Sequence, residues 1–450
     1  MFAPARRWLT SGLVLTITLV GFESLAVATV LPQVEEDLAD LALYGWVFSA
    51  YLLASLVGTV IGGREVDRRG AAAPFAVACV LFGVGLVLAG ITPSMPILVL
   101  ARVVQGLGAG VVPATAYAVI GREYPEALRP RMFAVLSTAW VLPGILGPAL
   151  AGVIEHAWGW RWVFLALLPL VALAAAITLP ALARLHPPAR TPEGAATSDA
   201  VLVAIGAGLF LGGLTASGLP ILVPLLAAAG VLVAFRPLRR LLPPGTLRGA
   251  AGLPAAIAVR GVLTFAFFGT DAFVPLVIQE VRDRSVAYTS VVLTVTTLCW
   301  TAGAWVQERL IVRYGPRAFV RFGLALIACG IAGVAAALWP DVPLAVLAVM
   351  WSIGTFGMGC AYASPSVVTL EQAPKGGEGG ASAALQLSDQ LGFALGAGIS
   401  GAAVALGETL RWAEADSLRV AASITAAVAI GGIVLAARLP SRLRAADVTP

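Results

Sequence analysis

The chain has 450 residues, of which 59% are hydrophobic and 12% charged, about half of the roughly 25% charged content of soluble domains. Its mean hydropathy of +0.92 indicates one polytopic membrane protein rather than several soluble domains. The net charge of +5 comes from short basic segments spread along the chain. This spread excludes a single nucleic-acid-binding patch and favours contact with the lipid bilayer.

Fourteen apolar stretches approach the ~20 residues that a helix needs to cross a bilayer, which predicts an all-α polytopic membrane protein. They run over residues 9–31, 43–62, 73–91, 96–120, 131–154, 161–183, 200–217, 219–235, 254–279, 286–307, 318–338, 342–369, 379–406 and 418–437. The uncharged run between Asp199 and Arg236 would measure about 54 Å as one helix, too long for a single crossing. Gly218-Leu219-Pro220 interrupts it, so a two-helix transmembrane hairpin over 200–235 is predicted, with an interfacial hairpin as the alternative.

The basic residues fix an expected orientation. Most of the 29 Arg and Lys residues fall in every second gap between the predicted spans, starting with Arg6 and Arg7 before the first. By the positive-inside rule, both termini are expected in the cytoplasm of a multi-pass plasma (inner) membrane protein. No signal-peptide cleavage site is evident, so the first span is expected to be retained.

The four cysteines each lie inside an apolar run without a CxxC pattern, so we expect buried small side chains and neither a metal site nor another cofactor. They are Cys79, Cys299, Cys329 and Cys360.

The sequence also repeats itself. Gly21-Phe22-Glu23 matches Gly269-Thr270-Asp271 at an offset of 248, and Gly108-Ala109-Gly110 matches Gly357-Met358-Gly359 at 249. Gly144 and Gly392 differ by 248, and Arg68-Arg69-Gly70 matches Arg313-Tyr314-Gly315 at 245. The repeat predicts two pseudo-symmetric six-helix bundles at 1–183 and 254–450, joined by a cytoplasmic linker over 184–253 that carries the hairpin.

The loop after the second span reads Gly63-Arg64-Glu65-Val66-Asp67-Arg68-Arg69-Gly70. It resembles the G-x-x-x-D-R-x-G signature loop of the major facilitator superfamily, although Ala71 and Ala72 replace the usual basic pair. The resemblance implies the major facilitator fold. Asp67 and the arginines are then expected to form charge-assisted bonds that latch neighbouring helix ends, and a purely topology-setting basic loop is the alternative.

Two further elements carry the same resemblance. Arg102-Val103-Val104-Gln105-Gly106 is similar to the family's R-x-x-q-G element, and Gly147-Pro148 with Gly152 partly matches the G-P-x-x-G-G element of exporters. Pro143 and Pro148 are expected to bend the fifth span, with close helix packing as the alternative role of this segment.

The first span, from Phe22-Glu23 to Leu31-Pro32, resembles the L-D-x-T-I-V-N-V-A-L-P segment of fourteen-span drug:proton antiporters, with Glu23 in place of the aspartate. The resemblance implies proton-coupled efflux, with protons as coupling ions.

Ionisable side chains inside predicted spans are costly and mark functional sites. They are Glu23, Arg102, Arg260, Asp271 and Asp389. Glu23 and Asp271 are expected to line a cavity, and Glu23 is the preferred proton carrier, against the alternative of a static ion pair. Arg102 is expected either to tune an acid's proton affinity or to serve in packing, and Asp389 either to titrate or to join a polar cluster. Arg260 is expected to snorkel to the cytoplasmic interface.

Several aromatic residues lie away from the predicted interfaces. Phe22, Tyr117, Trp140, Trp300, Trp351 and Tyr362 are candidates for the substrate cavity, with lipid-facing or core packing as the alternative. In a cavity they would favour large apolar or cationic molecules through stacking and cation–π contacts.

Together these features predict a secondary active transporter that exports hydrophobic or amphipathic small molecules by alternating access and acts as a monomer. Export or flipping of lipid-like metabolites is the alternative within transport. An enzyme is not expected, since the sequence lacks G-x-G-D before Asp271 and has neither a Walker motif nor a histidine inside a span. A non-transporting receptor is the remaining alternative.

Overall fold

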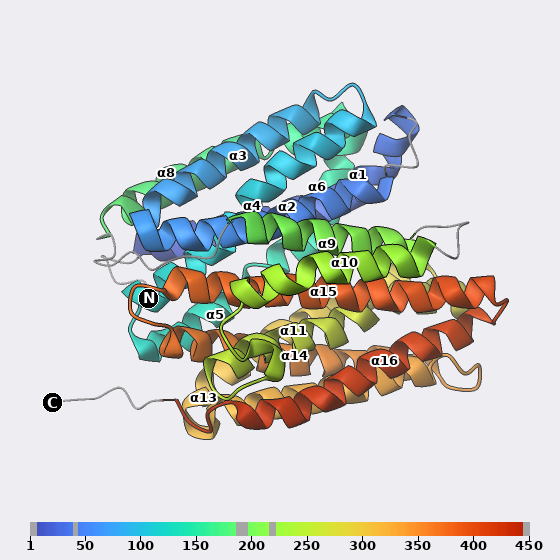
Figure 1. Ribbon diagram of the computed structural model, residues 1–450. Coiled ribbons are helices and arrows are strands. Elements are labelled where there is room, and N and C mark those ends of the chain that lie inside the picture. The colour runs from blue at the N-terminus through green and yellow to red at the C-terminus, as the bar shows by residue number, and fades with distance from the viewer. Residues whose placement is uncertain (1–6, 39–43, 186–196, 216–221, 444–450) are drawn as a thin grey trace. The chain divides into compact units, whose positions relative to one another are not determined.

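The computed structural model describes residues 7–38, 44–185, 197–215 and 222–443 (Figure 1). These residues form helices and no strand. The helices are α1 (Arg7–Leu38), α2 (Tyr44–Arg69), α3 (Ala72–Gly90), α4 (Met95–Glu123), α5 (Arg129–Thr138), α6 (Val141–Trp158), α7 (Arg161–Leu165), α8 (Leu168–Ala183), α9 (Thr197–Thr215), α10 (Leu222–Leu241), α11 (Leu253–Asp271), α12 (Val274–Leu276), α13 (Val286–Ala336), α14 (Leu344–Gln372), α15 (Glu378–Thr409) and α16 (Glu414–Leu435).

By length and composition, nine helices of the described ranges can cross a membrane, or ten if Glu126–Gly144 and Ala149–Trp158 form one bent span. The predicted count of fourteen is therefore not confirmed. Part of the difference lies in α13, whose apolar stretch of 49 residues would measure about 74 Å if unbroken, more than twice the bilayer core. Gly315 breaks α13 with a φ of 78°, between the two spans predicted at 286–307 and 318–338.

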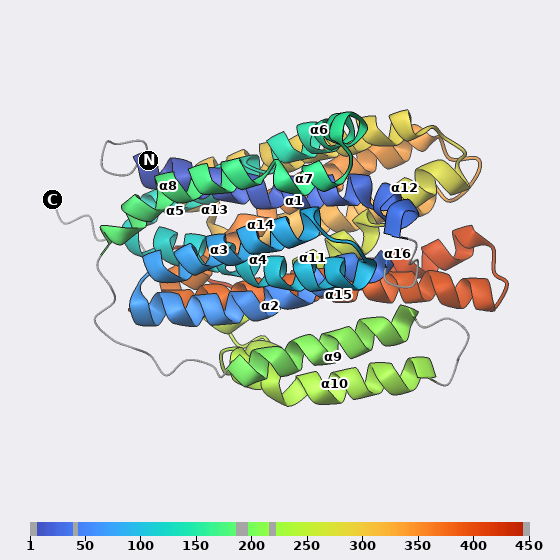
Figure 2. The same cartoon turned by 90° about the horizontal axis from the view of Figure 1, so that it is seen from above.

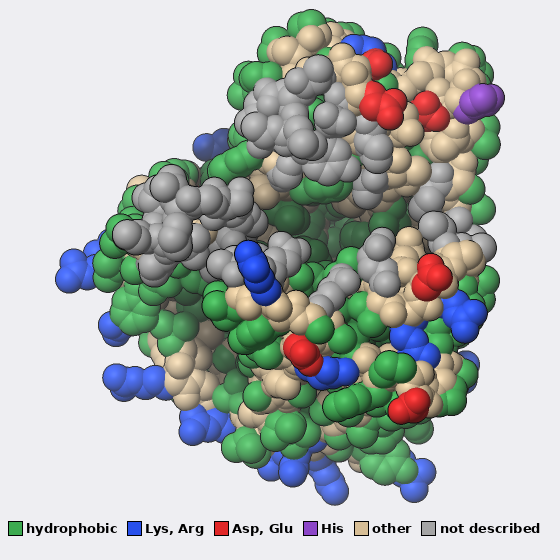
Figure 3. All heavy atoms as spheres, turned by 90° about the vertical axis from the view of Figure 1, so that its right-hand side faces the viewer, with side chains coloured by type: hydrophobic (Ala, Val, Ile, Leu, Met, Phe, Trp, Pro, Cys, Tyr) green, Lys and Arg blue, Asp and Glu red, His purple; other side chains and the backbone are tan. Residues whose placement is uncertain are grey.

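Apolar side chains also cover the outside of the helices, as in a protein surrounded by lipid. Val77, Val80 and Val84 of α3 are 57%, 63% and 45% exposed and recur every three or four residues, along one face of the helix. Figure 3 looks along the helices onto one end of the molecule, where hydrophobic side chains also make up much of the surface and charged ones lie singly or in small groups.

The chain forms two units that interleave along the sequence. Unit 1 comprises Met1–Leu128, Val135–Ile205 and Ala373–Leu387, and unit 2 comprises Arg129–Ala134, Gly206–Gln372 and Ser388–Pro450. In unit 1, α4 packs against both α2 and α3 (Figure 2), and in unit 2, α14 packs along α13. Each unit has its own buried apolar core. The domain boundaries predicted from the sequence stay a prediction.

The internal repeat is confirmed by matching helix contacts within the two units. In each unit there are three places where a Cβ added to a glycine would collide with, or press on, the backbone of the neighbouring helix. The pairs are Gly58–Leu107, Gly110–Ser55 and Gly108–Phe82 in unit 1 and, in the same order, Gly303–Phe356, Gly359–Trp300 and Gly357–Ile327 in unit 2. Each residue of these pairs on α2 or α3 corresponds to a residue of α13 that lies 245 positions later. Each residue on α4 corresponds to a residue of α14 that lies 249 positions later.

The turn that follows the second span repeats as well. Gly70 after α2 has a φ of 79°, and Gly315, which lies 245 positions later, has a φ of 78°. Both values are in the left-handed region that glycine enters without a steric penalty. A glycine at the equivalent position thus ends the corresponding helix in each unit.

Two helices occupy the predicted hairpin segment. α9 and α10 lie side by side (Figures 1 and 2), and a Cβ at Gly206 would lie 2.6 Å from the carbonyl oxygen of Gly230. The predicted break at Gly218-Leu219-Pro220 lies outside the described residues. Within this pair, Thr197–Phe210 is an apolar helix, but it is shorter than a membrane span. The prediction that the hairpin crosses the membrane is therefore not confirmed.

Candidate functional site

Glu23 lies in a fully buried polar cluster of unit 1. It is 0% exposed on α1 and forms an ion pair with Arg102 of α4, which is 1% exposed. Arg102 also donates to Gln105 Oε1 at 2.7 Å and to the carbonyl oxygen of Val47 at 3.1 Å. Its guanidinium lies 4.3 Å from the ring centroid of Tyr51. The structure thus brings together the two charged residues that the sequence placed in the first and fourth spans.

The two partners of this ion pair are bonded unequally. Glu23 Oε2 is buried and has no hydrogen-bond partner among the described residues, whereas Arg102 has two acceptors besides Glu23. A proton added to Oε2 would neutralise the carboxylate and leave Arg102 with hydrogen bonds to Gln105 and Val47. The arrangement can therefore accommodate both charge states of Glu23, which a buried ion pair without other acceptors does not.

Asp271, the counterpart of Glu23 in the repeat, has a neutral partner. It is half-buried at the end of α11, and its Oδ1 accepts a hydrogen bond of 3.1 Å from Trp351 Nε1 of α14. Trp351 follows Arg102 by 249 positions, the offset that relates α14 to α4. The same pair of positions is therefore an acid with a cation in unit 1 and an acid with an indole in unit 2.

Asp389 belongs to a second buried ion pair, and the expectation for Arg260 is wrong. Arg260 of α11 is 0% exposed, and its Nε lies 3.1 Å from Asp389 Oδ1 of α15. It also donates to Ser366 Oγ at 2.9 Å and to the carbonyl oxygen of Tyr362, whose hydroxyl donates to Asp389 Oδ2 at 3.0 Å. Arg260 does not snorkel because these acceptors satisfy its charge inside the protein. Asp389 therefore lies in a polar cluster between helices.

Three of the six aromatic candidates meet in one cluster of unit 2. Trp300 packs edge-on against Phe267 and Tyr362, with centroids 5.3 and 5.4 Å apart, and Trp351 stacks on Phe267 at 5.0 Å. Phe268 connects Trp300 to Phe393 of α15. The cluster joins four helices, α11, α13, α14 and α15.

The other three aromatic candidates lie in unit 1. Phe22 is half-buried on α1, 3.9 Å from the position of a Cβ at Gly147. Trp140 is 44% exposed and packs on Gly21, and Tyr117 is 8% exposed on α4. Phe22 and Trp140 thus flank the segment of α1 that carries Glu23.

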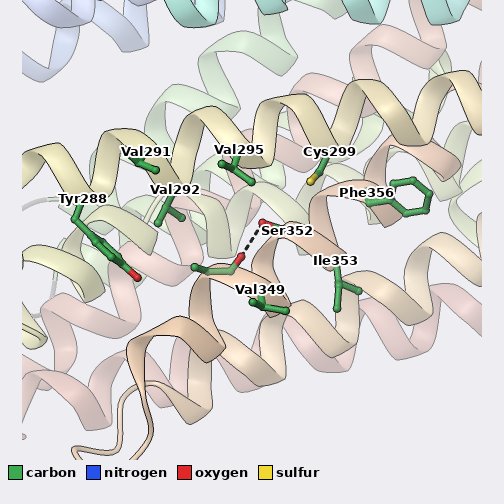
Figure 4. Close-up of a pocket in the computed structure, with 10 residues that line it drawn as sticks. Tyr288, Val291, Val292, Val295, Cys299, Val349, Ser352, Ile353 and Phe356 are labelled. Carbon is green, nitrogen blue, oxygen red and sulfur yellow. Dashed lines mark hydrogen bonds between the residues drawn. The ribbon is translucent and has the colours of Figure 1, made fainter.

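A hydrophobic groove of about 530 Å³ runs between the first half of α13 and α14 in unit 2 (Figure 4). Its lining includes Tyr288, Val292, Val295 and Cys299 of α13 and Val349, Ser352, Ile353 and Phe356 of α14. The hydroxyl of Ser352 donates to the carbonyl oxygen of Ala348 at 2.7 Å, one turn earlier in its own helix. The groove therefore offers an almost wholly apolar surface.

The signature loop holds the first turn of α15. Asp67 Oδ1 accepts from the backbone N–H of Gly379 at 2.8 Å and Asp67 Oδ2 accepts from that of Gly380 at 2.6 Å. These groups are the unsatisfied donors of a helix N-terminus, which attracts an anion. Arg122 forms ion pairs with Asp67 and with Glu378, the latter at 3.0 Å. All these residues belong to unit 1, and we call them the Asp67 latch.

The sequence did not identify Arg122 as the cation of the Asp67 latch. Arg68 and Arg69 pair with Glu65 at 3.1 and 2.9 Å rather than with Asp67. Gly63 approaches α15 so closely that an added Cβ would lie 2.5 Å from the Cβ of Ala383. Arg122 lies in the last turn of α4, and the sequence alone did not distinguish it from the other basic residues between the fourth and fifth spans.

The exporter-like segment in α6 bends as expected. Glu126–Gly144 and Ala149–Trp158 meet at 41°, and Gly147 lies at the break. A Cβ at Gly147 would lie 3.5 Å from that of Leu25, an ordinary contact, and Gly152 has no atom within 4 Å of the same position. The side chain of Pro148 lies outside the described residues.

Comparison with known proteins agrees with this fold. A family model described as Major Facilitator Superfamily matches residues 13–397. A protein of Mycobacterium tuberculosis named a probable multidrug-efflux transporter is 27% identical over 94% of this chain and 93% of its own. The tetracenomycin C resistance and export protein of Streptomyces glaucescens is also 27% identical, over 95% of this chain and 82% of its own.

Solved structures show the same fold at low identity. The human organic anion transporter superposes with a TM-score of 0.73 at 14% identity, over 96% of this chain and 100% of that one. A proton:xylose symporter superposes with a TM-score of 0.68 at 13% identity, over 96% and 95% of the two chains. The family-model match covers most of the sequence, and an enzyme is excluded because this family consists of transporters. The chain belongs to the Major Facilitator Superfamily and is a multi-pass membrane transporter.

Proposed function

We propose that the protein exports hydrophobic or amphipathic small molecules across the plasma membrane in exchange for protons, by alternating access. The observation that carries the proposal is the Glu23–Arg102 pair, in which Glu23 Oε2 is buried and unpartnered among the described residues. Glu23 is the proposed proton carrier. Arg102 stabilises its ionised form, and Gln105 and Val47 support Arg102 when the proton is bound.

The aromatic surface of unit 2 supports an apolar cargo. Trp300, Phe268 and Phe393 are half-buried and present ring faces or edges, which stack on planar or bulky apolar molecules without requiring a specific hydrogen-bond pattern. The curated relatives named for multidrug efflux and for tetracenomycin C export favour the outward direction. We propose that the protein acts as a monomer, with both termini in the cytoplasm.

The Asp67 latch supplies an element whose bonds can be exchanged during transport. Its bonds are charge-assisted but few, and Asp67 and Glu378 share the cation Arg122. In the proposed cycle the first turn of α15 leaves Asp67 when the cytoplasmic side opens and returns when it closes. Protonation of Glu23 and binding of cargo then bias the two states.

Export of a lipid-like molecule is a second candidate, favoured by the groove between α13 and α14. Its apolar lining and volume of about 530 Å³ suit a hydrocarbon chain. Reconstituted vesicles with a fluorescent lipid analogue would test this candidate by measuring how fast a membrane-impermeant quencher reaches the analogue with and without the protein.

The experiment that tests proton-coupled export uses everted membrane vesicles energised to an acid interior. Adding a cargo should partly collapse the pH gradient in vesicles that contain the wild-type protein. It should leave the gradient unchanged in vesicles that contain Glu23→Gln. Glu36→Gln, an exposed acid at the end of the same helix, is the matched control and should behave as wild type. A collapse with Glu23→Gln as large as that with wild type, at equal protein levels, would contradict the assignment.

A further inference from the structure

We propose that the groove between the first half of α13 and α14 is a binding site for one acyl chain of a bilayer phospholipid. The chain lies there as a resident part of the folded protein and is not a cargo. The site belongs to unit 2 alone and does not depend on the proposed export function. The origin of the groove, its length, and the surface onto which it opens all point to this occupant.

The internal repeat explains why the groove exists. In unit 1, Arg102 of α4 donates to the carbonyl oxygen of Val47 on α2, and its guanidinium lies over the ring of Tyr51. Gly106 adds a close contact, because a Cβ at this position would collide with the carbonyl oxygen of Tyr51. The first two turns of α2 are therefore held tightly against α4.

Unit 2 lacks both of these contacts. Trp351 stands in the place of Arg102, and its indole donates to Asp271 of α11 and not to α13. Thr355 stands in the place of Gly106, and its hydroxyl donates within its own helix. Since close approach of two helices requires small side chains, Thr355 keeps α13 further from α14 than α2 is from α4. The helices of unit 2 thus leave a groove where their counterparts touch.

The groove is about as long as one leaflet of a bilayer. It runs along α13 from Tyr288 to Cys299 and reaches Phe356 on α14 (Figure 4). A helix rises about 17 Å over this part of α13, and half of a hydrocarbon core of about 30 Å is about 15 Å. Beyond Cys299 the helices meet closely, because a Cβ at Gly303 would collide with the carbonyl oxygen of Phe356. The groove is therefore open near the start of both helices and closed one leaflet deeper.

The groove opens onto the lipid-facing surface of the helices. Val291 and Val295 on the α13 side and Val349 on the α14 side are exposed. Exposed apolar side chains of a membrane-spanning helix contact lipid, so the groove continues the lipid interface of the protein inward. Trp300 and Trp351 do not line the groove. A chain can thus enter from the bilayer without passing through the aromatic cluster.

The lining fits a hydrocarbon chain and makes no demand for a polar ligand. The hydroxyl of Ser352 already donates to the carbonyl oxygen of Ala348. A lipid chain in a bilayer is already removed from water, so the free energy gained on entry comes from dispersion contacts with two fixed helices. A chain that fills the whole length of the groove should therefore bind better than a shorter one.

A positive charge near the open end complements the phosphate of a phospholipid. Arg284 is exposed one turn before Tyr288, and no ion pair between described residues includes it. Its neighbour Arg282 is engaged by backbone carbonyl oxygens. Asp283 is exposed as well, so this end of the groove carries little net charge that would select an anionic headgroup. The site should distinguish lipids by chain length more strongly than by headgroup.

The test locates the chain by photolabelling. The full chain is reconstituted into vesicles of phosphatidylethanolamine and phosphatidylglycerol with a trace of phospholipid that carries a diazirine at the end of one palmitoyl chain. Peptide mass spectrometry identifies the labelled residues after illumination. We expect labels to concentrate at Cys299 and Phe356, at the closed end. A diazirine at the end of an octanoyl chain should label residues nearer Tyr288, and at a lower yield.

Variants with a filled groove show whether the groove causes this labelling. Val295→Trp should lower labelling at Cys299 and Phe356 at least about fivefold, because the chain loses its contacts with one of the two helices. Val434→Trp, at an exposed position of α16, is the matched control and should label as wild type does. Each variant is checked by its elution profile, and Val349→Trp on the opposite side keeps the test decisive if Val295→Trp fails to fold.

Labels spread evenly over the exposed faces of the helices, or equal labelling of wild type and Val295→Trp, would overturn the proposal. Suppression by excess tetraphenylphosphonium, a bulky apolar cation, would overturn it by showing that the groove holds cargo. So would loss of lipid-analogue transfer in Val295→Trp, which would make the lipid itself a cargo. Labelling that falls as the protein density in the vesicles rises would mean that a second copy fills the groove. Failure of proton-coupled export would leave the expected labelling unchanged, because no titrating group takes part in binding.

Discussion

The unequal bonding of Glu23 and Arg102 predicts that removing either partner has a different energetic effect. In Glu23→Gln, Arg102 keeps Gln105 at 2.7 Å, Val47 at 3.1 Å and the ring of Tyr51. The variant therefore loses one hydrogen bond between charged groups, which corresponds to about 1.5–3 kcal/mol. In Arg102→Met, the fully buried Glu23 loses its cation, and its Oε2 already lacks a partner among the described residues. Breaking a buried pair in this way costs about 3–5 kcal/mol.

The measurement is the free energy of unfolding in detergent micelles for wild type, both single variants and the double variant. We expect Arg102→Met to be less stable than Glu23→Gln by about 2 kcal/mol, the difference between the two ranges. The double variant should be more stable than Arg102→Met alone, because it removes the uncompensated charge as well. Lowering the pH should reduce the loss in Arg102→Met but not in Glu23→Gln, since only the former contains a carboxylate that protonation can neutralise.

Equal losses in the two single variants would refute this reasoning. They would mean that Gln105, Val47 and Tyr51 do not stabilise the Arg102 cation, and the proposal that Glu23 changes protonation without disrupting the cluster would lose its physical basis.

Three further predictions concern the close helix contacts, the Asp67 latch and the internal repeat. Gly359→Ala should destabilise the protein by about 1–3 kcal/mol by overpacking, whereas Gly152→Ala, with no atom near the added methyl, should be neutral or stabilising in thermal unfolding. Asp67→Asn should increase alkylation of single cysteines introduced at the start of α15, because it weakens the bonds that hold this turn; unchanged alkylation would show that the latch does not control access. At an offset of 249 positions, Glu371 corresponds to Arg122 and Arg129 corresponds to Glu378, with both charges interchanged. Transport should therefore fall in Glu371→Arg and recover in Glu371→Arg with Arg129→Glu; no recovery would contradict a paired role.

The fold and the presence of charged sites could be predicted from the sequence because lipid imposes simple rules. Apolar length predicts helices, and each charge in a span needs a partner or a function, which directed attention to Glu23, Arg102, Asp271 and Asp389. The glycine register also predicted the repeat, because close helix contacts tolerate only small side chains. The family resemblance added the signature loop.

The identity of the partners could not be predicted, because it depends on how helices rotate and cross. Arg260 and Asp389 are far apart in sequence and meet because α11 and α15 approach closely, with a Cβ at Gly392 lying 2.8 Å from the Cα of Gly261. The position of Arg260 along its predicted span, considered alone, suggested that its side chain snorkels to the cytoplasmic interface. The same applies to Arg122, whose bonds to Asp67 and Glu378 depend on the position of the α15 N-terminus.

The exchange of protons for cargo is tested most directly with purified protein in proteoliposomes that contain a pH-sensitive dye. An imposed cargo gradient alone, without a pH difference at the start, should drive proton movement in the opposite direction through the wild-type protein. Proteoliposomes with equal amounts of Glu23→Gln should show none. Cargo movement through the wild-type protein without any change in internal pH, or proton movement that Glu23→Gln leaves intact, would contradict the account.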